Sequence, residues 1–398
     1  MKFIKNQEIS DKFNVSFPTV LKWVENKLDK NNLQTSLFNK KLMVLDNPHN
    51  LAELQKLAEN SRRFRSNINL KKIKPDKRFY EIFNSAQIIE IINDLEIHNS
   101  IEYKFTYLDY GTSFWNNFYL NNAPNELYPT PKRVNDLLEN IFEYLLYQLG
   151  NSQKFNIIDI GPGNGLPVKN LLEKLSKVEK LKKYTSLDIS SKMNELANEN
   201  IKKWFPSLEI QSVVADIEIA NFVPIFFENK MYCEKSVNLI LYLGGTIGNH
   251  KNINLALSNI QKGLGKDDLL LISNTLENQN VQTETNYIET EEARTQDTWI
   301  PKMLGFDVSK CQIITQFEGV GVGKTEKLEI DKDYILEIQT GSQTKKLEFI
   351  KGQKITLWRH KMSNLDTLPL EFKSCSLQIH QLTALKDLSH AMILCKSI

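Results

Sequence analysis

The sequence lacks the patterns that mark several large classes of protein. Its four cysteines lie far apart and form no Cys-x-x-Cys pair, which excludes a disulfide framework and gives no sign of a metal site. No apolar run approaches the ~18 residues of a membrane-spanning helix, and residues 1–10 lack the apolar core of a signal peptide. A formal net charge of +2 gives no overall attraction to nucleic acid or membrane. We expect a cytoplasmic protein without a membrane partner.

The most informative stretch of the 398 residues runs from Phe155 to Gly165. An apolar run leads through Asp159 into Gly161, Gly163 and Gly165, and a helical pattern follows at once, which predicts a strand, a glycine turn and a helix. Glycines tolerate positive φ and let a ligand approach the backbone closely. The spacing departs from the G-x-G-x-x-G fingerprint and lacks the Gly-Lys-Ser/Thr ending that grips phosphates. Because Asp159 would also repel phosphate, a nucleoside without phosphates fits better.

Acidic residues close the next two predicted strands. Tyr184–Asp188 reads as a strand that ends in an acid roughly 20 residues downstream, where a carboxylate can accept hydrogen bonds from a ribose diol. Gln211–Ala215 reads as a third strand, followed by Asp216. Parallel strands of an open sheet place such ends in one crevice. A plain strand-to-helix turn would explain the glycines, but both acids together indicate binding of S-adenosylmethionine (SAM).

The remaining strands complete the predicted nucleotide domain, residues 136–275. Ser236–Leu243 is almost continuously apolar, as expected of a strand buried on both faces. It ends at Gly244, which we add to the predicted cofactor contacts. A helix at Ile253–Gly263 and a strand at Asp268–Ser273 follow. The alternation predicts an α/β fold with a Rossmann-like, doubly wound sheet.

The regions on either side of this domain are expected to form a discontinuous substrate domain. Residues 71–135 contain loop-like aromatic clusters at Phe105–Ser113 and Leu127–Thr130, suited to a lid over the crevice. Residues 276–398 alternate in short β-like runs from Cys311 onward, which would shape the substrate side of the crevice. Burial in an ordinary helical core would also explain most of the aromatic residues singly.

Residues 1–70 read as a separate module with a winged helix-turn-helix outline. A short helix from Glu8, a tight turn at Asn14–Ser16 and a second helix at Pro18–Glu25 precede a hairpin over residues 35–45. This stretch resembles the MerR and excisionase families. The resemblance implies DNA contact through lysines such as Lys22. The other candidates for neutralising phosphate are Lys27, Lys30, Lys40 and Lys41. A packing role or a protein contact stays open.

The landmarks of residues 73–398 together resemble the histidine-specific methyltransferases of the ergothioneine pathway and their fungal relatives that act on prenylated tryptophan. The matching segments are Tyr107 with Gly111-Thr112, Tyr128-Pro129-Thr130, the glycine turn, Leu187–Ser190, Phe205-Pro206, Asp216 and Gly245–Asn249. The Gly-Thr-Ile-Gly-Asn segment is unusual among SAM enzymes. The resemblance implies that Gly161, Asp188 and Asp216 hold SAM.

On the acceptor side, the resemblance implies that Asn249 hydrogen-bonds the carboxylate or amine of the acceptor. It also implies that Tyr107 and Tyr128 line the amino-acid site and that Tyr287 contacts a carboxylate. Of these residues, Tyr107, Asn249 and Tyr287 are the candidates for a catalytic role. Asn249 would alternatively serve as a helix cap.

The sequence departs from the family where the imidazole of histidine is held. Trp358 and His360 stand where the family has a glutamate and a serine, and Thr130-Pro131 replaces Thr-Arg. A pocket without that glutamate loses the charged hydrogen-bond partner of an imidazole. Trp358 and His360 become candidate substrate contacts, and we expect a different or larger amine than free histidine.

The sequence therefore predicts a SAM-dependent N-methyltransferase that acts on an amino-acid-like amine. Aligning a neutral nitrogen with the activated methyl group supplies most of the catalysis, and an α-amine with a pKa near ~7.7–8.0 has a useful neutral fraction without a strong base. An alternative is a DNA-binding regulator whose SAM-type domain senses a ligand without catalysis.

Overall fold

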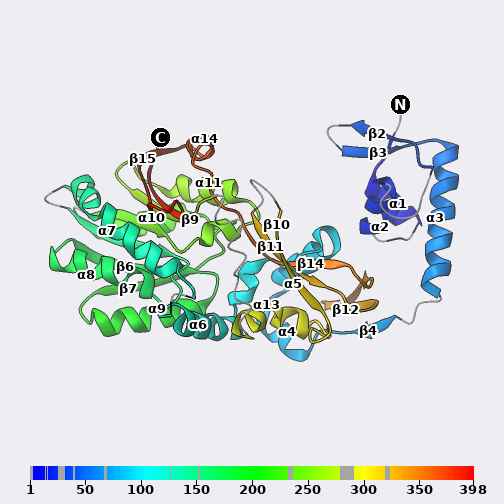
Figure 1. The fold of residues 1–398 in the computed structure, drawn as a ribbon, viewed down its shortest axis with the longest axis horizontal. Coiled ribbons are helices and arrows are strands. Elements are labelled where there is room, and N and C mark those ends of the chain that lie inside the picture. The colour runs from blue at the N-terminus through cyan, green and yellow to red at the C-terminus, as the bar shows by residue number, and fades with distance from the viewer. Residues whose placement is uncertain are drawn as a thin grey trace. The chain divides into compact units, whose positions relative to one another are not determined.

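The computed structural model describes residues 3–13, 15, 17–25, 32–38, 41–66, 70–125, 127–150, 153–231, 236–277, 291–318 and 323–398. The chain divides into two compact units. Unit 1 comprises Met1–Ile101, Pro301–Ile313 and Lys327–Thr356, and unit 2 comprises Glu102–Ile300, Ile314–Glu326 and Leu357–Ile398. Figure 1 shows the fold and labels many of its helices and strands.

A seven-stranded sheet forms the centre of unit 2, in the order β15-β16-β9-β8-β5-β6-β7. Its strands are β5 (Lys154–Ile160), β6 (Leu181–Asp188), β7 (Glu209–Val214), β8 (Ser236–Tyr242), β9 (Leu269–Thr275), β15 (Leu377–Ala384) and β16 (His390–Ser397). Neighbouring strands from β7 to β9 run parallel, and β16 runs antiparallel to both β9 and β15. The predicted Rossmann-like sheet is confirmed, and its loops at the carboxyl ends of β5, β6 and β8 meet at one edge.

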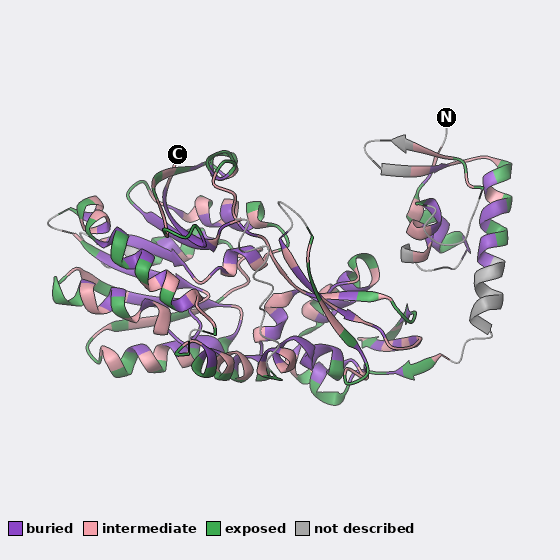
Figure 2. Cartoon of the chain, viewed as in Figure 1, coloured by how far each residue is buried: buried purple, intermediate pink, exposed green. Residues whose placement is uncertain are grey.

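Helices bury the sheet of unit 2 on both faces. They are α7 (Thr130–Leu149), α8 (Lys169–Lys177), α9 (Ser191–Trp204), α10 (Phe222–Met231), α11 (Ile253–Gly263) and α14 (Leu368–Ser374). One core contains residues of α7 and α8 with Phe155 and Ile157, and the other contains residues of α10, α11 and α14 with Ile158 and Ile160. Alternate residues of β5 thus point into opposite cores, which explains why every residue from Phe155 to Ile160 is buried. Figure 2 shows the buried residues concentrated along these strands and inner helix faces.

The last two strands of the sheet come from a part of the chain that the sequence analysis assigned to the substrate domain. The predicted nucleotide domain ended at residue 275, whereas β15 and β16 add to its sheet beyond β9. The pairing of β16 with β9 joins residues such as His390 and Thr275 that are distant in sequence, so no local pattern indicates it. The division of the chain into four domains otherwise stays a prediction.

Shorter elements of unit 2 surround the carboxyl edge of the sheet. They are η2 (Tyr103–Tyr107), α6 (Tyr110–Asn122), η3 (Leu166–Val168) and η4 (Thr246–Asn249). The segment expected to be loop-like at Phe105–Ser113 therefore contains the end of a 3-10 turn and the start of a helix. Helix α13 (Glu291–Met303) and strands β10 (Gln312–Phe317), β11 (Lys324–Glu329) and β14 (Lys354–His360) cross the division between the units, and β10-β11-β14 form a three-stranded sheet.

Unit 1 contains two further sheets. Near the N-terminus, β1 (Phe3–Ile4), α1 (Asn6–Phe13), α2 (Phe17–Val24), β2 (Thr35–Phe38), β3 (Lys41–Leu45) and α3 (Pro48–Ser66) follow one another, with the strand order β1-β3-β2. Ile9, Val20 and Trp23 are buried in its core. Two helices and a hairpin lie near the predicted positions, and both the winged helix-turn-helix assignment and a DNA-binding role for this module stay predictions. Lys27, Lys30 and Lys40 lie outside the described residues.

The second sheet of unit 1 has the strand order β13-β12-β4. Its strands are β4 (Lys71–Ile73), β12 (Tyr334–Thr340) and β13 (Gln343–Phe349), and the accompanying helices are α4 (Lys77–Ile82), α5 (Ser85–Asn93) and η1 (Asp94–His98). Tyr334, Leu336 and Ile338 of the central strand β12 are buried. Within the described part of the chain, no helix has the length and apolarity to cross a membrane.

Candidate active site

A cavity opens in unit 2 at the carboxyl edge of the seven-stranded sheet. Residues at the ends of three strands contribute to its wall: Asp159 in β5, Asp188 at the end of β6 and Leu243 immediately after β8. The glycine turn after β5, the segment η2 and the segment η4 supply further lining residues, among them Gly161, Gly163, Tyr107 and Asn249. Residues widely separated in the sequence therefore meet where open α/β sheets bind their ligands.

The glycine turn has the backbone geometry that only glycine adopts without strain. Gly161, Gly163 and Gly165 have φ values of 65°, 58° and 74°, in the left-handed region that other residues rarely adopt. The backbone N–H of Gly161 donates to the carbonyl oxygen of Leu187 over 2.9 Å, which fixes the turn to the next strand. A Cβ atom at Gly163 would lie 2.4 Å from the ring of Trp115. Gly163 and Trp115 are thus so close that no side chain larger than hydrogen fits between them.

Asp159 and Asp188 bring two buried carboxyl groups to the cavity. The hydroxyl of Tyr184 donates to Asp159 over 2.8 Å, and the backbone N–H of Ser190 donates to Asp188 over 2.8 Å. Burial raises the pKa of each carboxyl group to about 7, although these hydrogen bonds favour ionisation. A ligand that donates hydrogen bonds to Asp188 would stabilise its ionised form. A ribose diol is such a ligand.

Asp216, the third predicted acid, is held by neighbouring protein groups. One carboxylate oxygen forms an ion pair with Lys104, with 2.6 Å between Oδ2 and Nζ, and the other accepts the backbone N–H of Glu218 over 3.0 Å. The described lining of the cavity includes Lys104, Ile217 and Glu218, but not Asp216. A direct contact between Asp216 and the cofactor stays a prediction. Gly244, with a φ of 74°, lines the cavity after β8 and donates its N–H to the hydroxyl of Ser273.

Asn249 has its amide orientation fixed by residues of β14. Its Oδ1 accepts hydrogen bonds from Nε1 of Trp358 and from Nδ1 of His360, each over 3.2 Å. Because an indole nitrogen only donates, the oxygen of the amide must face Trp358. The NH₂ group therefore faces away from Trp358. Asn249 lines the cavity, so the structure orients a neutral hydrogen-bond donor at its wall.

His360 supports Asn249 and is not among the residues that line the cavity. Its ring stacks on that of Trp358, with centroids 5.8 Å apart and planes inclined by 5°. Its Nε2 accepts from the hydroxyl of Thr275 over 3.1 Å, which leaves the proton on Nδ1 for Asn249. Burial lowers the pKa of His360 to about 4, so the ring is neutral. Trp358 likewise lies outside the cavity lining and contacts Asn249 through its indole nitrogen.

Tyr107 and Tyr128 belong to an aromatic wall of the cavity. The other members are Tyr103, Trp115 and Tyr119. The rings of Tyr103 and Tyr107 lie 5.3 Å apart in an edge-to-face arrangement, and Tyr119 contacts both Trp115 and Tyr128. Burial raises the pKa of Tyr107 well above its ordinary value and that of Tyr128 to about 12, so both hydroxyls stay neutral. Faces of aromatic rings attract cations, so this wall suits a sulfonium or an ammonium group.

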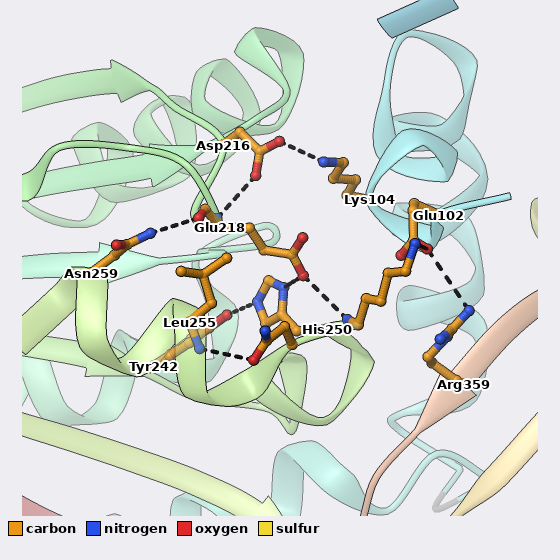
Figure 3. A network of polar contacts seen from close by, with 11 residues as sticks. Glu102, Lys104, Asp216, Glu218, Tyr242, His250, Leu255, Asn259 and Arg359 are labelled. Atoms are coloured by element: carbon orange, nitrogen blue, oxygen red, sulfur yellow. Dashed lines mark hydrogen bonds and ion pairs between the residues drawn. The ribbon is translucent and has the colours of Figure 1, made fainter. Parts of the chain in front are cut away.

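A network of charged residues, which the sequence analysis did not single out, borders the cavity (Figure 3). Glu218 accepts hydrogen bonds from Nδ1 of His250 over 3.0 Å and from the backbone N–H of Lys251 over 3.2 Å, and Nε2 of His250 contacts the hydroxyl of Tyr242. Burial alone would raise the pKa of Glu218. The hydrogen bond and charge of His250 and the charge of Lys104 outweigh it, so the pKa of Glu218 is lowered. Only the position of Glu218 two residues after Asp216 marked it in the sequence. Tyr287 lies outside the described residues.

Comparison with known families identifies the chain. A family model described as "Histidine-specific methyltransferase, SAM-dependent" matches residues 86–297, which is more than half of the chain. The match contains the glycine turn, both buried aspartates and Asn249. No curated protein matches the sequence.

Solved structures of methyltransferases also align with the chain. A SAM-dependent methyltransferase from Clostridium acetobutylicum is 11% identical over 79% of this chain and 99% of its own, with a TM-score of 0.37. Magnesium protoporphyrin IX methyltransferase from Synechocystis is 10% identical over 74% and 98%, with a TM-score of 0.39. The glycopeptide N-methyltransferase MtfA is 11% identical over 65% and 93%, with a TM-score of 0.34.

Proposed function

Because the chain belongs to the histidine-specific, SAM-dependent methyltransferase family, we propose that it methylates the nitrogen of an amino-acid-like amine other than free histidine. The family match establishes a SAM-dependent methyltransferase, and SAM is its cofactor. It favours catalysis over the alternative of a DNA-binding regulator with a non-catalytic, ligand-sensing domain. The nature of the acceptor is our inference from the site.

The orientation of Asn249 is the observation that carries this proposal. Its oxygen is engaged by Trp358 and His360, so its NH₂ group is left to donate hydrogen bonds at the cavity wall. A carboxylate accepts such bonds well. An acceptor with a carboxylate next to its amine would therefore be anchored at one end by Asn249. The amine would then face the aromatic wall that contains Tyr107 and Tyr128.

The buried residues that surround the cavity fit SAM. Asp188 offers a carboxylate for the ribose hydroxyls, and the open backbone of Gly161 and Gly244 leaves room for close approach. When bound, SAM supplies a methyl group on an activated sulfonium, which an amine displaces directly. The chain's own contribution is to orient the acceptor and exclude water. Because the hydroxyls of Tyr107 and Tyr128 stay neutral, they contribute dipoles rather than charge to this wall.

The hydrogen bonds from Trp358 and His360 to Asn249 argue against histidine as the acceptor. The resemblance to the family aligns Trp358 and His360 with the glutamate and serine that hold the imidazole, in a region beyond the matched residues 86–297. Both residues donate to Asn249. Neither provides a carboxylate for an imidazole N–H. The wall near Asn249 instead contains the aromatic ring of Tyr103. An acceptor with a larger or apolar side chain fits this surface better than an imidazole, whose N–H group meets no carboxylate from Trp358 or His360.

The test is a transfer assay with methyl-labelled SAM and a panel of free amino acids, their methyl esters and simple amines. We expect label on the α-nitrogen of acceptors with a free carboxylate, little on the matching esters and little on histidine. Asn249→Ala should lower kcat/KM by roughly tenfold to a hundredfold, the loss of a hydrogen bond to a charged group, and leave SAM binding unchanged.

Asn254→Ala is the matched control, because Asn254 is exposed on α11. It should behave as the unaltered protein. Equal transfer to acids and esters, efficient methylation of histidine, or an Asn249→Ala variant with full activity would contradict the proposal.

A further inference from the structure

The ion pair between Lys104 and Asp216 joins two parts of the cavity wall that are 112 positions apart in sequence. Its atoms lie 2.6 Å apart, and each side chain is 15% exposed. Lys104 belongs to η2, the segment that ends at Tyr107. Asp216 follows β7 and is bound to the backbone of Glu218. Figure 3 shows Lys104 reaching Asp216 across the edge of the site.

A second set of contacts anchors the same segment at its start. Glu102, immediately before η2, forms ion pairs with Lys251 and Arg359. Its Oε1 lies 3.7 Å from Nζ of Lys251 and 3.8 Å from Nη2 of Arg359. Lys251 follows the segment that contains Asn249, and Arg359 lies on β14 between Trp358 and His360. Both ends of the stretch Glu102–Lys104 are therefore tied by charge to elements that border the cavity (Figure 3).

We propose that Lys104 is a positioning residue, which through Asp216 holds the segment Tyr103–Tyr107 closed over the bound cofactor. Tyr107 lines the cavity from this segment, and Ile217 and Glu218 line it from the loop that follows Asp216. In this proposal the segment separates from the loop when the cofactor enters or leaves. Formation of the ion pair then slows release of the cofactor and completes the acceptor side of the site.

The hydrogen bonds of Asp216 support this role rather than direct binding of the cofactor. One carboxylate oxygen is paired with Lys104, the other accepts the N–H of Glu218, and the side chain does not line the cavity. The loop is fixed from its other side as well, because Asn259 donates to the carbonyl oxygen of Glu218 over 2.6 Å and His250 binds its carboxylate. Lys104 thus attaches a lid segment to a rigid loop.

Variants of Lys104 and Asp216 distinguish two roles for Asp216, which are closing the site through Lys104 and binding the cofactor directly. If the ion pair closes the site, Lys104→Met and Asp216→Asn should each accelerate release of S-adenosylhomocysteine by about tenfold, an effect between that of an exposed ion pair and that of a fully buried one. The charge-reversed double variant Lys104→Glu/Asp216→Lys should restore slow release. If Asp216 binds the cofactor itself, only Asp216→Asn should weaken binding, and reversal should not restore it.

The measurement is stopped-flow release of S-adenosylhomocysteine from the full-length protein, with the equilibrium dissociation constant from calorimetry. Lys192→Met is the control, because it removes an ion pair to Asp109 beside the same segment but at a more exposed position. It should leave the release rate unchanged. Thermal unfolding checks that each variant is folded. If a single variant does not fold, the release rate of the charge-reversed double variant tests the proposal.

Fast release from the reversed variant, or a rate unchanged by Lys104→Met, would overturn the proposal. The assay needs only the cofactor product, so its outcome is independent of which amine accepts the methyl group. Failure here would leave the proposed acceptor class standing, and failure of the acceptor panel would leave this positioning role standing.

Discussion

Replacing Asp188 by asparagine should weaken SAM binding and stabilise the ligand-free protein at the same time. The substitution keeps the size of the side chain and one acceptor oxygen for the backbone N–H of Ser190. It removes the charge that would strengthen two hydrogen bonds from a ribose diol. Hydrogen bonds to charged groups contribute roughly 1.5–3 kcal/mol each. We therefore expect the dissociation constant for SAM to rise by about tenfold to a few hundredfold at pH 8.

The pH dependence of binding follows from the same carboxyl group. Burial raises the pKa of Asp188 to about 7 in the ligand-free protein, and a ligand that donates hydrogen bonds to it binds the ionised form. Affinity for SAM should fall as the pH falls below about 7, by up to tenfold for each pH unit. The fall should be smaller in Asp188→Asn. Asp159, whose pKa burial also raises to about 7, accounts for the remainder.

The effect on stability has the opposite sign. An unfolded aspartate has a pKa near ~3.9, so the folded protein binds this proton more tightly than the unfolded chain. Stability of the ligand-free protein therefore falls as the pH rises from about 4 to about 7, and the loss persists above pH 7. Asp188→Asn removes this loss. It should raise the free energy of unfolding at pH 8 by up to roughly 4 kcal/mol, since about three pKa units at ~1.4 kcal/mol each separate the folded and unfolded carboxyl groups. The gain should be smaller at pH 5.

Calorimetric titration with SAM and urea unfolding at pH 5 and pH 8 measure both effects. Asp267→Asn is the control, because Asp267 is an exposed carboxylate distant from the cavity lining. A variant that is less stable than the unaltered protein at pH 8 would refute the reasoning, since weaker binding would then reflect damage to the fold. Unchanged affinity for SAM would refute the assigned contact.

Three further predictions concern the glycine turn, β14 and the N-terminal module. Gly163→Ala should weaken SAM binding at least tenfold in calorimetry, because its Cβ would meet Trp115 at 2.4 Å, whereas Gly150→Ala, with a φ of 73° and nothing within 4 Å, should not. Trp358→Phe removes the donor that orients Asn249, so kcat/KM for the acceptor should fall about tenfold with SAM affinity unchanged; equal activity would show that the indole N–H is dispensable. Duplex DNA binding by the full-length chain should weaken steeply with salt and vanish when Lys22, Lys40 and Lys41 are neutralised, as read by fluorescence anisotropy; salt-independent binding would exclude phosphate contact.

The cofactor side of the site could be predicted because its signals are local. A strand, its glycine turn and the following helix are consecutive in the sequence, and each acid lies at the end of an apolar run. Position within the run places Asp159 and Asp188 at the same sheet edge without knowledge of other contacts. The structure brings Gly161, Gly163, Asp159 and Asp188 together at the cavity. Their contacts with the cofactor remain predictions.

The charged network could not be predicted because its partners come from distant segments. Lys104 and Asp216 are separated by 112 positions, and neither has a neighbour in sequence that indicates the pairing. The support of Asn249 by Trp358 and His360 depends likewise on β14 approaching η4. The family resemblance aligned Trp358 and His360 with substrate contacts, whereas in the structure both residues hydrogen-bond Asn249. Such contacts depend on packing between distant segments, which leaves no repeating pattern in the local sequence.

The insertion of β16 between β9 and β15 affects the order in which the protein can assemble. Thr275 and His390 are partners in adjacent strands although they lie 115 positions apart. Closing so long a loop is entropically unfavourable, and non-local strand pairing is slow. Until β16 arrives, β9 presents an unpaired and strongly apolar edge on which another chain could dock. The seven-stranded sheet of unit 2 is therefore exposed to aggregation during synthesis until β16 is in place.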